Sequence, residues 1–369
     1  MYWTLRALAQ DPEIELQLVA TGAHLSPEFG LTYREIEGDG FEIDGKVEML
    51  LSSDTAVGIT TSIGLGVIGF ASVLDRLKPH VVAVVGDRFE IFAAAQAALI
   101  ARIPIAHISG GDTTEGAYDE AIRHSLTKMA HLHFVTNAES ARRVLQMGED
   151  PKSIFQFGAP QLEHLRRTEL LSRAALEESI NYRFRNRNIL VTFHAVTLDH
   201  RSSADQFAEL LAALAALPDD VGFIFTLPNA DNDGRILIEM TNDFAKYQGN
   251  RAVVVPSLGH VRYLSALAQV DLVAGNSSSG IVEAPSFHKP TVNIGARQRG
   301  RTKAASVIDV EAERSAIGAA IQKAFALDCS RIVNPYGDGE TARRIVEVLR
   351  SHHIEGLLQK RFWPVESMQ

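Results

Sequence analysis

Short apolar runs recur along this chain and alternate with longer helical patterns. The runs contain few polar residues, which is typical of strands buried on both faces of a parallel sheet. They lie at 81–86, 103–109, 131–137, 154–158, 189–193, 222–228, 252–257, 272–276 and 291–295. This alternation predicts an α/β protein whose parallel strands are joined by right-handed crossovers.

A polar, arginine-rich stretch at about 169–188 interrupts the alternation, which then restarts. The length of 369 residues also exceeds what one hydrophobic core usually serves. We therefore predict two Rossmann-like domains, at 1–165 and 188–345, with a linker near 165–187. The C-terminal helix and tail, 346–369, are expected to pack back across the domain boundary.

Composition excludes several classes of function. The net charge of −9 argues against a nucleic-acid partner, because binding to a phosphate backbone needs clustered Lys and Arg. The single cysteine, Cys329, cannot form an internal disulfide, which fits a reducing compartment and a packing role. We identify no apolar run of the ~20 residues that span a bilayer and no signal peptide. The sequence thus predicts a soluble, cytoplasmic protein without a membrane partner.

The glycine pattern GLGVIG at 64–69 superficially matches a dinucleotide-binding fingerprint. That motif requires a buried strand immediately before it, and none is predicted here. Close packing of a helix is therefore the better interpretation of Gly64, Gly66 and Gly69.

Acidic residues are concentrated in HISGGDTTEGAYDEAIRH, at 107–124, directly after a predicted strand. They are Asp112, Glu115, Asp119 and Glu120. The carboxyl ends of parallel strands are where α/β sheets bind ligands, and acid/base chemistry needs carboxylates there. The structural alternative is a solvated salt-bridge ladder of Glu115, Asp119 and Arg123 along a helix.

Other polar residues also follow predicted strands. Asp87 and Arg88 come after 81–86, where Asp87 could instead cap a helix and Arg88 could pair with it or with a phosphate. His194 and Asn229 each follow a strand of the second domain. A structural histidine and a turn-forming asparagine are their ordinary alternatives.

The segment GNSSSGIVEAP has the form of a phosphate cradle at a helix N-terminus. Ser277 and Ser278 would hold the phosphate, and Glu283 would reach a ribose hydroxyl. Serine N-capping is the structural alternative. Arg297 and Arg301 add positive charge or form a solvated basic loop. Because all these clusters follow strands, we expect them to converge on one interdomain cleft.

The motifs GDRFE, HISGGDTTEGAYDEAIRHSLTKMAHLHF, GNSSSGIVEAPSF and PTVNIGARQRGR resemble hydrolysing UDP-N-acetylglucosamine 2-epimerases of sialic-acid and related nonulosonate biosynthesis. The resemblance covers nearly the whole chain. It implies a glycosyltransferase-B-like fold with the active site in the cleft, and conversion of UDP-N-acetylglucosamine and water to N-acetylmannosamine and UDP. It implies no metal or other cofactor, and a homodimer or homotetramer.

The resemblance also implies roles for individual residues. Asp87 and Asp119 become catalytic acids and bases, and His194 a further catalytic residue. Relatives have another catalytic glutamate where this chain has Ser109, so Asp112 or Glu115 is the expected substitute. The implied ligands of the UDP-sugar are Arg88, His194, Asn229, Ser277, Ser278, Glu283 and Arg297.

Two departures leave alternatives open. Relatives usually begin with a buried strand and an arginine-containing loop, whereas this sequence opens in the following helix, MYWTLRALAQ. Either Met1 is an internal methionine or the strand is missing, and without it we expect impaired stability and nucleotide affinity. The alternative functions are the same chemistry on a nucleotide-linked 2,4-diacetamido-2,4,6-trideoxyhexose, a non-hydrolysing epimerase, an inactive nucleotide-sugar-binding remnant, and a glycosyltransferase of this fold.

Overall fold

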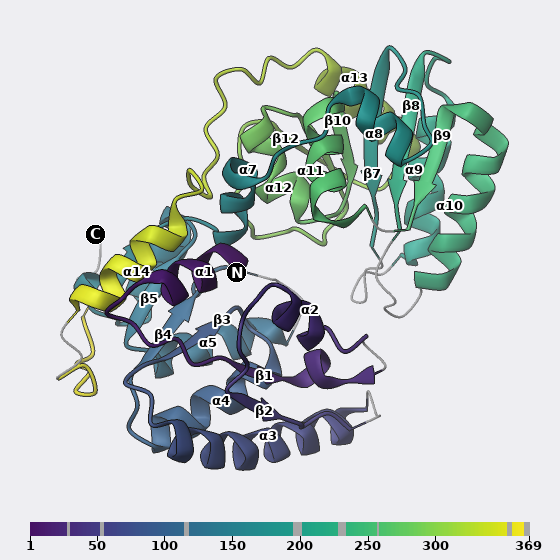
Figure 1. Ribbon diagram of the computed structural model, residues 1–369. Helices are drawn as coiled ribbons and strands as arrows, with labels where there is room; N and C mark the ends of the chain where they lie inside the picture. The colour runs from purple at the N-terminus through teal and green to yellow at the C-terminus, as the bar shows by residue number, and fades with distance from the viewer. Residues whose placement is uncertain are drawn as a thin grey trace. The chain divides into compact units, whose positions relative to one another are not determined.

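The computed structural model describes residues 1–27, 30–51, 55–113, 118–194, 201–227, 234–256, 258–352 and 356–364. The chain forms two compact α/β units (Figure 1). Unit 1 contains Met1–Thr113, Ala117–Pro160 and Glu340–Gln369, and unit 2 contains Gln161–Gly339. All strand pairs in the described part of the chain are parallel, as the β–α alternation predicts.

The strands of unit 1 are divided between two sheets. Four form a sheet in the order β3–β4–β5–β6, and β1 and β2 form a separate two-stranded sheet. The strands are β1 (Val19–Thr21), β2 (Gly45–Val47), β3 (Val82–Val85), β4 (Ile105–Ile108), β5 (Leu132–Val135) and β6 (Ile154–Gln156). The helices are α1 (Tyr2–Gln10), α2 (Tyr33–Gly38), α3 (Ala56–Leu77), α4 (Phe89–Ile100), α5 (Asp119–Met129), α6 (Ala138–Gln146) and α14 (Thr341–Ser351).

Unit 2 contains one sheet in the order β12–β11–β10–β7–β8–β9. Its strands are β7 (Arg187–Thr192), β8 (Val221–Thr226), β9 (Ala252–Val255), β10 (Leu272–Gly275), β11 (Thr291–Ile294) and β12 (Val307–Val310). Its helices are α7 (Glu163–Arg167), α8 (Arg173–Ser179), α9 (Ser203–Ala215), α10 (Gly234–Gln248), α11 (Gly259–Gln269), α12 (Ser279–Val282) and α13 (Arg314–Phe325).

All nine predicted strands are present, and β1, β2 and β12 were not predicted. The first two have only three residues each, which is too short for a periodic signal. Within the described ranges β12 pairs with β11 alone, and it is only partly buried, so its sequence carries Asp309 among apolar residues.

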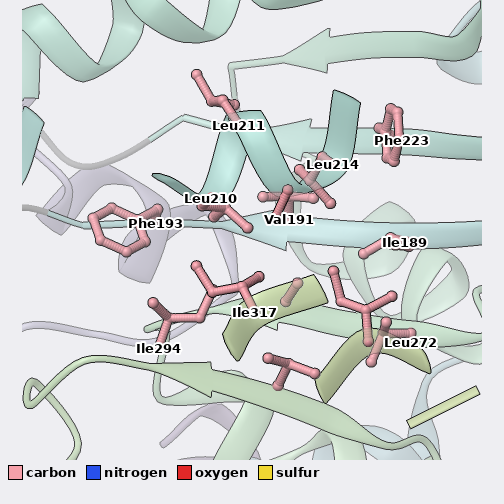
Figure 2. Close-up of a cluster of buried hydrophobic side chains, with 14 of the residues drawn as sticks. Ile189, Val191, Phe193, Leu210, Leu211, Leu214, Phe223, Leu272, Ile294 and Ile317 are labelled. Carbon is pink, nitrogen blue, oxygen red and sulfur yellow. The ribbon is translucent and has the colours of Figure 1, made fainter. Parts of the chain in front are cut away.

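The near-continuous apolar strands of unit 2 are explained by burial on both faces. Ile189 and Val191 of β7 lie in one core with Leu210 of α9 and Ile317 of α13 (Figure 2). Leu190, between them in sequence, lies in a second core on the other face. That second core also contains Leu176, Ile180 and Tyr182. The stretch for which the sequence predicts a linker is therefore folded into unit 2.

The core of unit 1 includes the C-terminal helix. Ile345 of α14 lies in a cluster with Ala106 and Ile108 of β4, and Met1 packs against the same cluster. Figure 1 shows α14 beside α1, the first helix of the chain. The chain thus returns to unit 1 after completing unit 2.

Helix α3 corrects one expectation from the sequence. It has 22 residues and is long and apolar enough to cross a membrane by length and composition, contrary to our reading of the sequence. A core helix of a soluble protein passes the same test.

The glycines of α3 allow close packing. A Cβ at Gly66 would lie 2.8 Å from Met49 Cε, and one at Gly69 would lie 2.7 Å from Val47 Cγ1. The predicted packing role is confirmed for these two glycines, whereas Gly64 faces open space.

Candidate active site

The loop after β3 is fixed by a buried histidine of β4. His107 Nε2 donates a hydrogen bond to the carbonyl of Gly86 at 2.8 Å, and its Nδ1 lies 3.2 Å from Thr127 Oγ1. Burial lowers the pKa of His107 to about 4, so the ring is neutral near pH 7. Gly86 adopts a φ of +78°, which favours glycine. This arrangement sets the backbone direction at the next residue, Asp87.

Arg123 of α5 brings three parts of unit 1 together. Its buried guanidinium forms an ion pair with the Asp87 carboxylate. Its Nη1 also donates to the carbonyl of Asp112 at 2.8 Å and to Glu120 Oε2 at 3.1 Å. The end of β3, the loop after β4 and the first turn of α5 therefore meet at one cation. Arg88 does not pair with Asp87, and it is Arg88 that occupies the N-cap position of α4.

Asp119, the first residue of α5, differs electrostatically from Asp87. Its pKa is raised by burial and then by the negative charges of Asp87 and Glu90, against the opposing effect of Arg88 and Arg123. A carboxyl group with a raised pKa holds its proton to higher pH. Divergent environments of two neighbouring carboxyl groups are the usual basis for separate acid and base roles.

Asp112 is held by hydroxyl groups from the next strand and helix. Its Oδ1 accepts hydrogen bonds from Thr136 Oγ1 at 2.6 Å and Ser140 Oγ at 2.5 Å. The preceding carbonyl, of Gly111, accepts a hydrogen bond from Arg143. These contacts anchor the loop after β4, so one oxygen of Asp112 is already engaged in structure. Glu115, the other expected substitute at this position, lies outside the described residues.

The predicted salt-bridge ladder does not describe α5 as a whole. Glu120 pairs with Arg123 and with His124, at 3.1 and 3.0 Å. Arg123 is nevertheless turned into unit 1 towards Asp87 rather than solvated. Nothing in the sequence marks Glu90, His107 or Arg123 as buried residues of this region, because the burial of a charged or titratable side chain depends on tertiary contacts.

The second candidate region lies where the strand order of unit 2 reverses. The chain runs from β7 outward to β9 and then resumes on the other side of β7 with β10. Ligands of open α/β sheets bind at such switch points. Here the His194 amide donates to Asn276 Oδ1 at 2.7 Å, and Asn276 Nδ2 donates back to the His194 carbonyl at 2.9 Å.

Asn276, a residue without a distinctive signal in the sequence, also binds the loop after β11. Its carbonyl accepts hydrogen bonds from Arg297 Nη1 at 3.0 Å and Gln298 Nε2 at 2.9 Å. The preceding Gly275 has a φ of +135°, and a Cβ there would lie 2.0 Å from the Thr192 carbonyl oxygen. Glycine is required because the ends of β7 and β10 approach so closely. The structure thus brings His194 and Arg297 to one edge of the sheet.

The serine segment leads into a short helix, α12. Ser278 is its N-cap residue but makes no side-chain capping hydrogen bond, whereas Ser277 Oγ accepts from the Ser279 amide at 3.3 Å. Burial raises the pKa of Glu283 at the end of this helix. Asn229 lies outside the described residues. No group of three or more potential metal ligands occurs within the part of the chain that the structure describes.

These features define a class of protein. Two Rossmann-like units with polar residues at the carboxyl ends of parallel strands form an α/β fold of the glycosyltransferase-B type. Residues 6–350 match the family described as UDP-N-acetylglucosamine 2-epimerase, and the chain belongs to that family.

Individual relatives are similar over most of the chain. A hydrolysing GDP/UDP-N,N'-diacetylbacillosamine 2-epimerase of Campylobacter jejuni is 38% identical over 304 residues, covering 82% of this chain and 79% of the relative. A hydrolysing UDP-N,N'-diacetylbacillosamine 2-epimerase of Legionella pneumophila is 33% identical over 347 residues, covering 94% of this chain and 91% of the relative. The structure of a Neisseria meningitidis UDP-GlcNAc 2-epimerase bound to UDP-GlcNAc superimposes with a TM-score of 0.71 at 20% identity, covering 95% of each chain.

Proposed function

We propose that this protein is a hydrolysing 2-epimerase of a nucleotide-linked 2,4-diacetamido-2,4,6-trideoxyhexose. The substrate is suggested by the names of the two relatives that are 38% and 33% identical. The motif resemblance favoured UDP-N-acetylglucosamine, and these relatives support the alternative substrate better. UDP-N-acetylglucosamine stays the second candidate, because a Neisseria meningitidis relative bearing that name is 30% identical over 364 residues.

The reaction needs two proton transfers at one carbon. The C1–O bond to UDP breaks with oxocarbenium character, and loss of the C2 proton gives a glycal. Water then adds its hydroxyl group to C1 while a proton is delivered to C2 on the opposite face. The products are UDP and the free C2-epimeric sugar, and the overall reaction consumes one water molecule.

Asp87 and Asp119 are proposed to carry these proton transfers. The ion pair with Arg123 holds the Asp87 carboxylate in place, and we propose that this carboxylate accepts the C2 proton. The raised pKa of Asp119 suits this group to donate a proton. The contrast between these two carboxyl groups is the observation that carries the proposal. Asp112 and Glu115 remain further candidates, with Asp112 already engaged through one oxygen.

Unit 2 is proposed to bind the nucleotide. Arg297 would provide positive charge for the diphosphate, and His194, fixed by Asn276, would donate a hydrogen bond or a proton to it. The other proposed ligands are Ser277 and Ser278 for phosphate, Glu283 and Asn229 for ribose or base, and Arg88 of unit 1. Stabilisation of the leaving diphosphate would accelerate the first step because charge develops there.

The test is incubation in heavy water with each of the two nucleotide sugars, followed by proton NMR. Free UDP together with the C2-epimeric diacetamido sugar carrying deuterium at C2 is the expected result. An epimeric sugar still attached to UDP would identify a non-hydrolysing enzyme. UDP binding without turnover of either sugar would contradict the proposal and indicate a binding remnant. Transfer that depends on an acceptor would indicate a glycosyltransferase.

A cytoplasmic location and a homodimer or homotetramer complete the proposal. The location follows from the composition and the assembly from the family resemblance. Sedimentation of the purified protein over a range of concentrations measures the assembly directly.

A further inference from the structure

A tight turn, Asn334–Gly337, lies in the connection between α13 and α14. The Gly337 amide donates to the Asn334 carbonyl at 3.3 Å, and the Tyr336 amide donates to Asn334 Oδ1 at 2.9 Å. Asn at the first position, Pro at the second and Gly at the fourth are residues that β-turns favour. An Asn side chain often accepts a hydrogen bond from the amide two residues further on. The turn therefore fixes the positions of Asn334 and Tyr336 relative to each other.

The Asn334 side chain binds the end of α12. Its Nδ2 donates to the Val282 carbonyl at 2.7 Å and to Ser286 Oγ at 2.6 Å. The last carbonyls of a helix have no partner within it, and α12 has only four residues. Asn334 provides a partner for one of these carbonyls. It therefore supports the end of the short helix, directly before Glu283.

The Tyr336 side chain binds the loop after β11. Tyr336 is 4% exposed, and its hydroxyl donates to the Thr302 carbonyl at 2.9 Å. Val333, three residues earlier, is 83% exposed, so burial is not a property of the whole connection. The same loop is also held through Arg297, whose Nη1 donates to the Asn276 carbonyl. The loop is thus fixed at two points.

This one turn contacts both segments of unit 2 that carry proposed nucleotide ligands. We propose that Asn334 and Tyr336 are positioning residues, which hold the end of α12 and the loop after β11 so that Glu283 and Arg297 are aligned for the nucleotide. Both side chains bind main-chain carbonyls, so they act on the course of the backbone in these segments. This inference rests on the proposed function, because nucleotide binding by Glu283 and Arg297 is part of that proposal.

The Tyr336→Phe variant removes only the hydroxyl group. It should weaken UDP binding by about 3–10-fold, because the loop that carries Arg297 loses a hydrogen bond. Tyr182→Phe is the matched control. Tyr182 is 5% exposed, lies in the same unit and donates to the Arg251 carbonyl at 3.4 Å. That carbonyl lies directly before β9, at the amino ends of the parallel strands, whereas the proposed ligands follow carboxyl ends.

The two tyrosine variants distinguish a positioning role from a structural one. Both should lower the melting temperature, and only Tyr336→Phe should change the dissociation constant of UDP measured by calorimetry. Unchanged UDP affinity in Tyr336→Phe, or an equal loss in Tyr182→Phe, would overturn the proposal.

A double-mutant cycle with Arg297→Gln tests whether Tyr336 acts through the loop. Once Arg297 is replaced, Tyr336→Phe should weaken UDP binding by less than about 2-fold, because the ligand that Tyr336 positions is already lost. An equal factor with and without Arg297 would contradict action through this loop.

Asn334→Ser tests the other contact of the turn. The serine oxygen can still accept from the Tyr336 amide, but the side chain is too short to reach the Val282 carbonyl. UDP binding should weaken by about 3–10-fold. This effect should shrink when Glu283 is also replaced by Gln. Unchanged UDP affinity in Asn334→Ser would overturn the role of Asn334.

Hydrogen exchange of the nucleotide-free protein separates this inference from the proposed function. The amides of Arg299 and Arg301 donate hydrogen bonds within the loop, at 2.9 and 3.4 Å. They should exchange faster in Tyr336→Phe and at the unaltered rate in Tyr182→Phe. Unchanged exchange in Tyr336→Phe would overturn the positioning role. If exchange is faster but the unaltered protein binds neither UDP nor a nucleotide sugar, Tyr336 fixes the loop and the proposed function fails.

Discussion

Unit 2 has one continuous six-stranded sheet, whereas the strands of unit 1 are divided between sheets of two and four strands. β7, the first strand of unit 2, has neighbours on both sides and is buried along Asn188–Thr192. Among the residues that the structure describes, β3 has a neighbour only on the β4 side, and its Val85 is 37% exposed. Val84 of β3 and Val47 of β2 nevertheless belong to the same core.

Because of this difference, we expect the two units to lose stability and activity independently of each other. An unpaired strand edge exposes backbone groups and apolar side chains that a continuous parallel sheet covers. Unit 1 places one of its two candidate acid/base residues, Asp87, directly after the edge strand β3. Unit 2 places its candidate nucleotide ligands after fully paired strands. We therefore expect substitutions in unit 1 to affect catalysis and stability most. Substitutions in unit 2 should mainly affect nucleotide affinity.

The largest expected effect separates the chemistry of the two units. Asp119→Asn should lower kcat by roughly 10²–10⁴-fold, because general acid catalysis is lost, with UDP affinity nearly unchanged. Arg297→Gln should instead weaken UDP binding by about 10–100-fold, because a charge-assisted hydrogen bond is lost. Steady-state kinetics and calorimetry of UDP binding measure the two effects. Loss of UDP affinity in Asp119→Asn would contradict the proposal that unit 1 carries the proton transfers and unit 2 binds the nucleotide.

Acid should unfold unit 1 first. Burial lowers the pKa of His107 and of His131 to about 4, and that of His133 also falls. The unfolded histidines bind protons near pH 6.5 while the folded ones do not, so stability is present above that pH and is lost as the pH falls towards 4. In unit 2 the pKa values of His164 and His260 are also lowered, but neither of these side chains is buried, unlike the three in unit 1.

For His107 alone the linked free energy is about 3 kcal/mol. His107→Gln can still donate to the Gly86 carbonyl but does not titrate, so its stability should depend less on pH between 6.5 and 4. Residue-resolved hydrogen exchange at several pH values measures both units in one sample. Equal acid sensitivity of the two sheets would contradict this prediction.

Paired glycine substitutions test whether the units unfold separately. Gly66→Ala in α3 and Gly280→Ala in α12 each place a Cβ within 2.8 Å of a neighbour, Met49 Cε or Thr291 Cγ2. Each should destabilise its own unit by about 1–3 kcal/mol through overpacking. Gly64→Ala has open space and should stabilise α3 by up to ~1 kcal/mol. Calorimetry should show two transitions, of which only one moves in each variant.

The smallest effect concerns the divided sheet itself. A short apolar strand fused before Met1 could pair with the free edges of β1 and β3 and cover Val85. We expect it to stabilise unit 1 by about 0.5–1 kcal/mol and to leave unit 2 unchanged. An extension of equal length rich in Pro is the control, because it cannot form the ladder. Equal melting curves for the two extensions would argue against a strand site between these edges.

The sequence by itself determined the parallel α/β architecture, because the buried strands are apolar on both faces and so appear as continuous runs. It also singled out Asp87, Asp119, His194 and Arg297 as candidate site residues, since polar residues that follow strands stand out against those runs. The short strands β1 and β2 escaped detection because three residues carry no periodicity.

Only the tertiary structure decided the partners of these groups. Arg88, the neighbour of Asp87 in sequence, was one possible partner for its carboxylate, but Asp87 pairs with Arg123, which is 36 residues away. Asn276 is one polar residue in a polar segment, and its central place becomes visible only where β7, β10 and β11 end together. Which carboxyl group donates a proton depends on burial and neighbouring charge, and these arise when distant segments of the chain pack against one another.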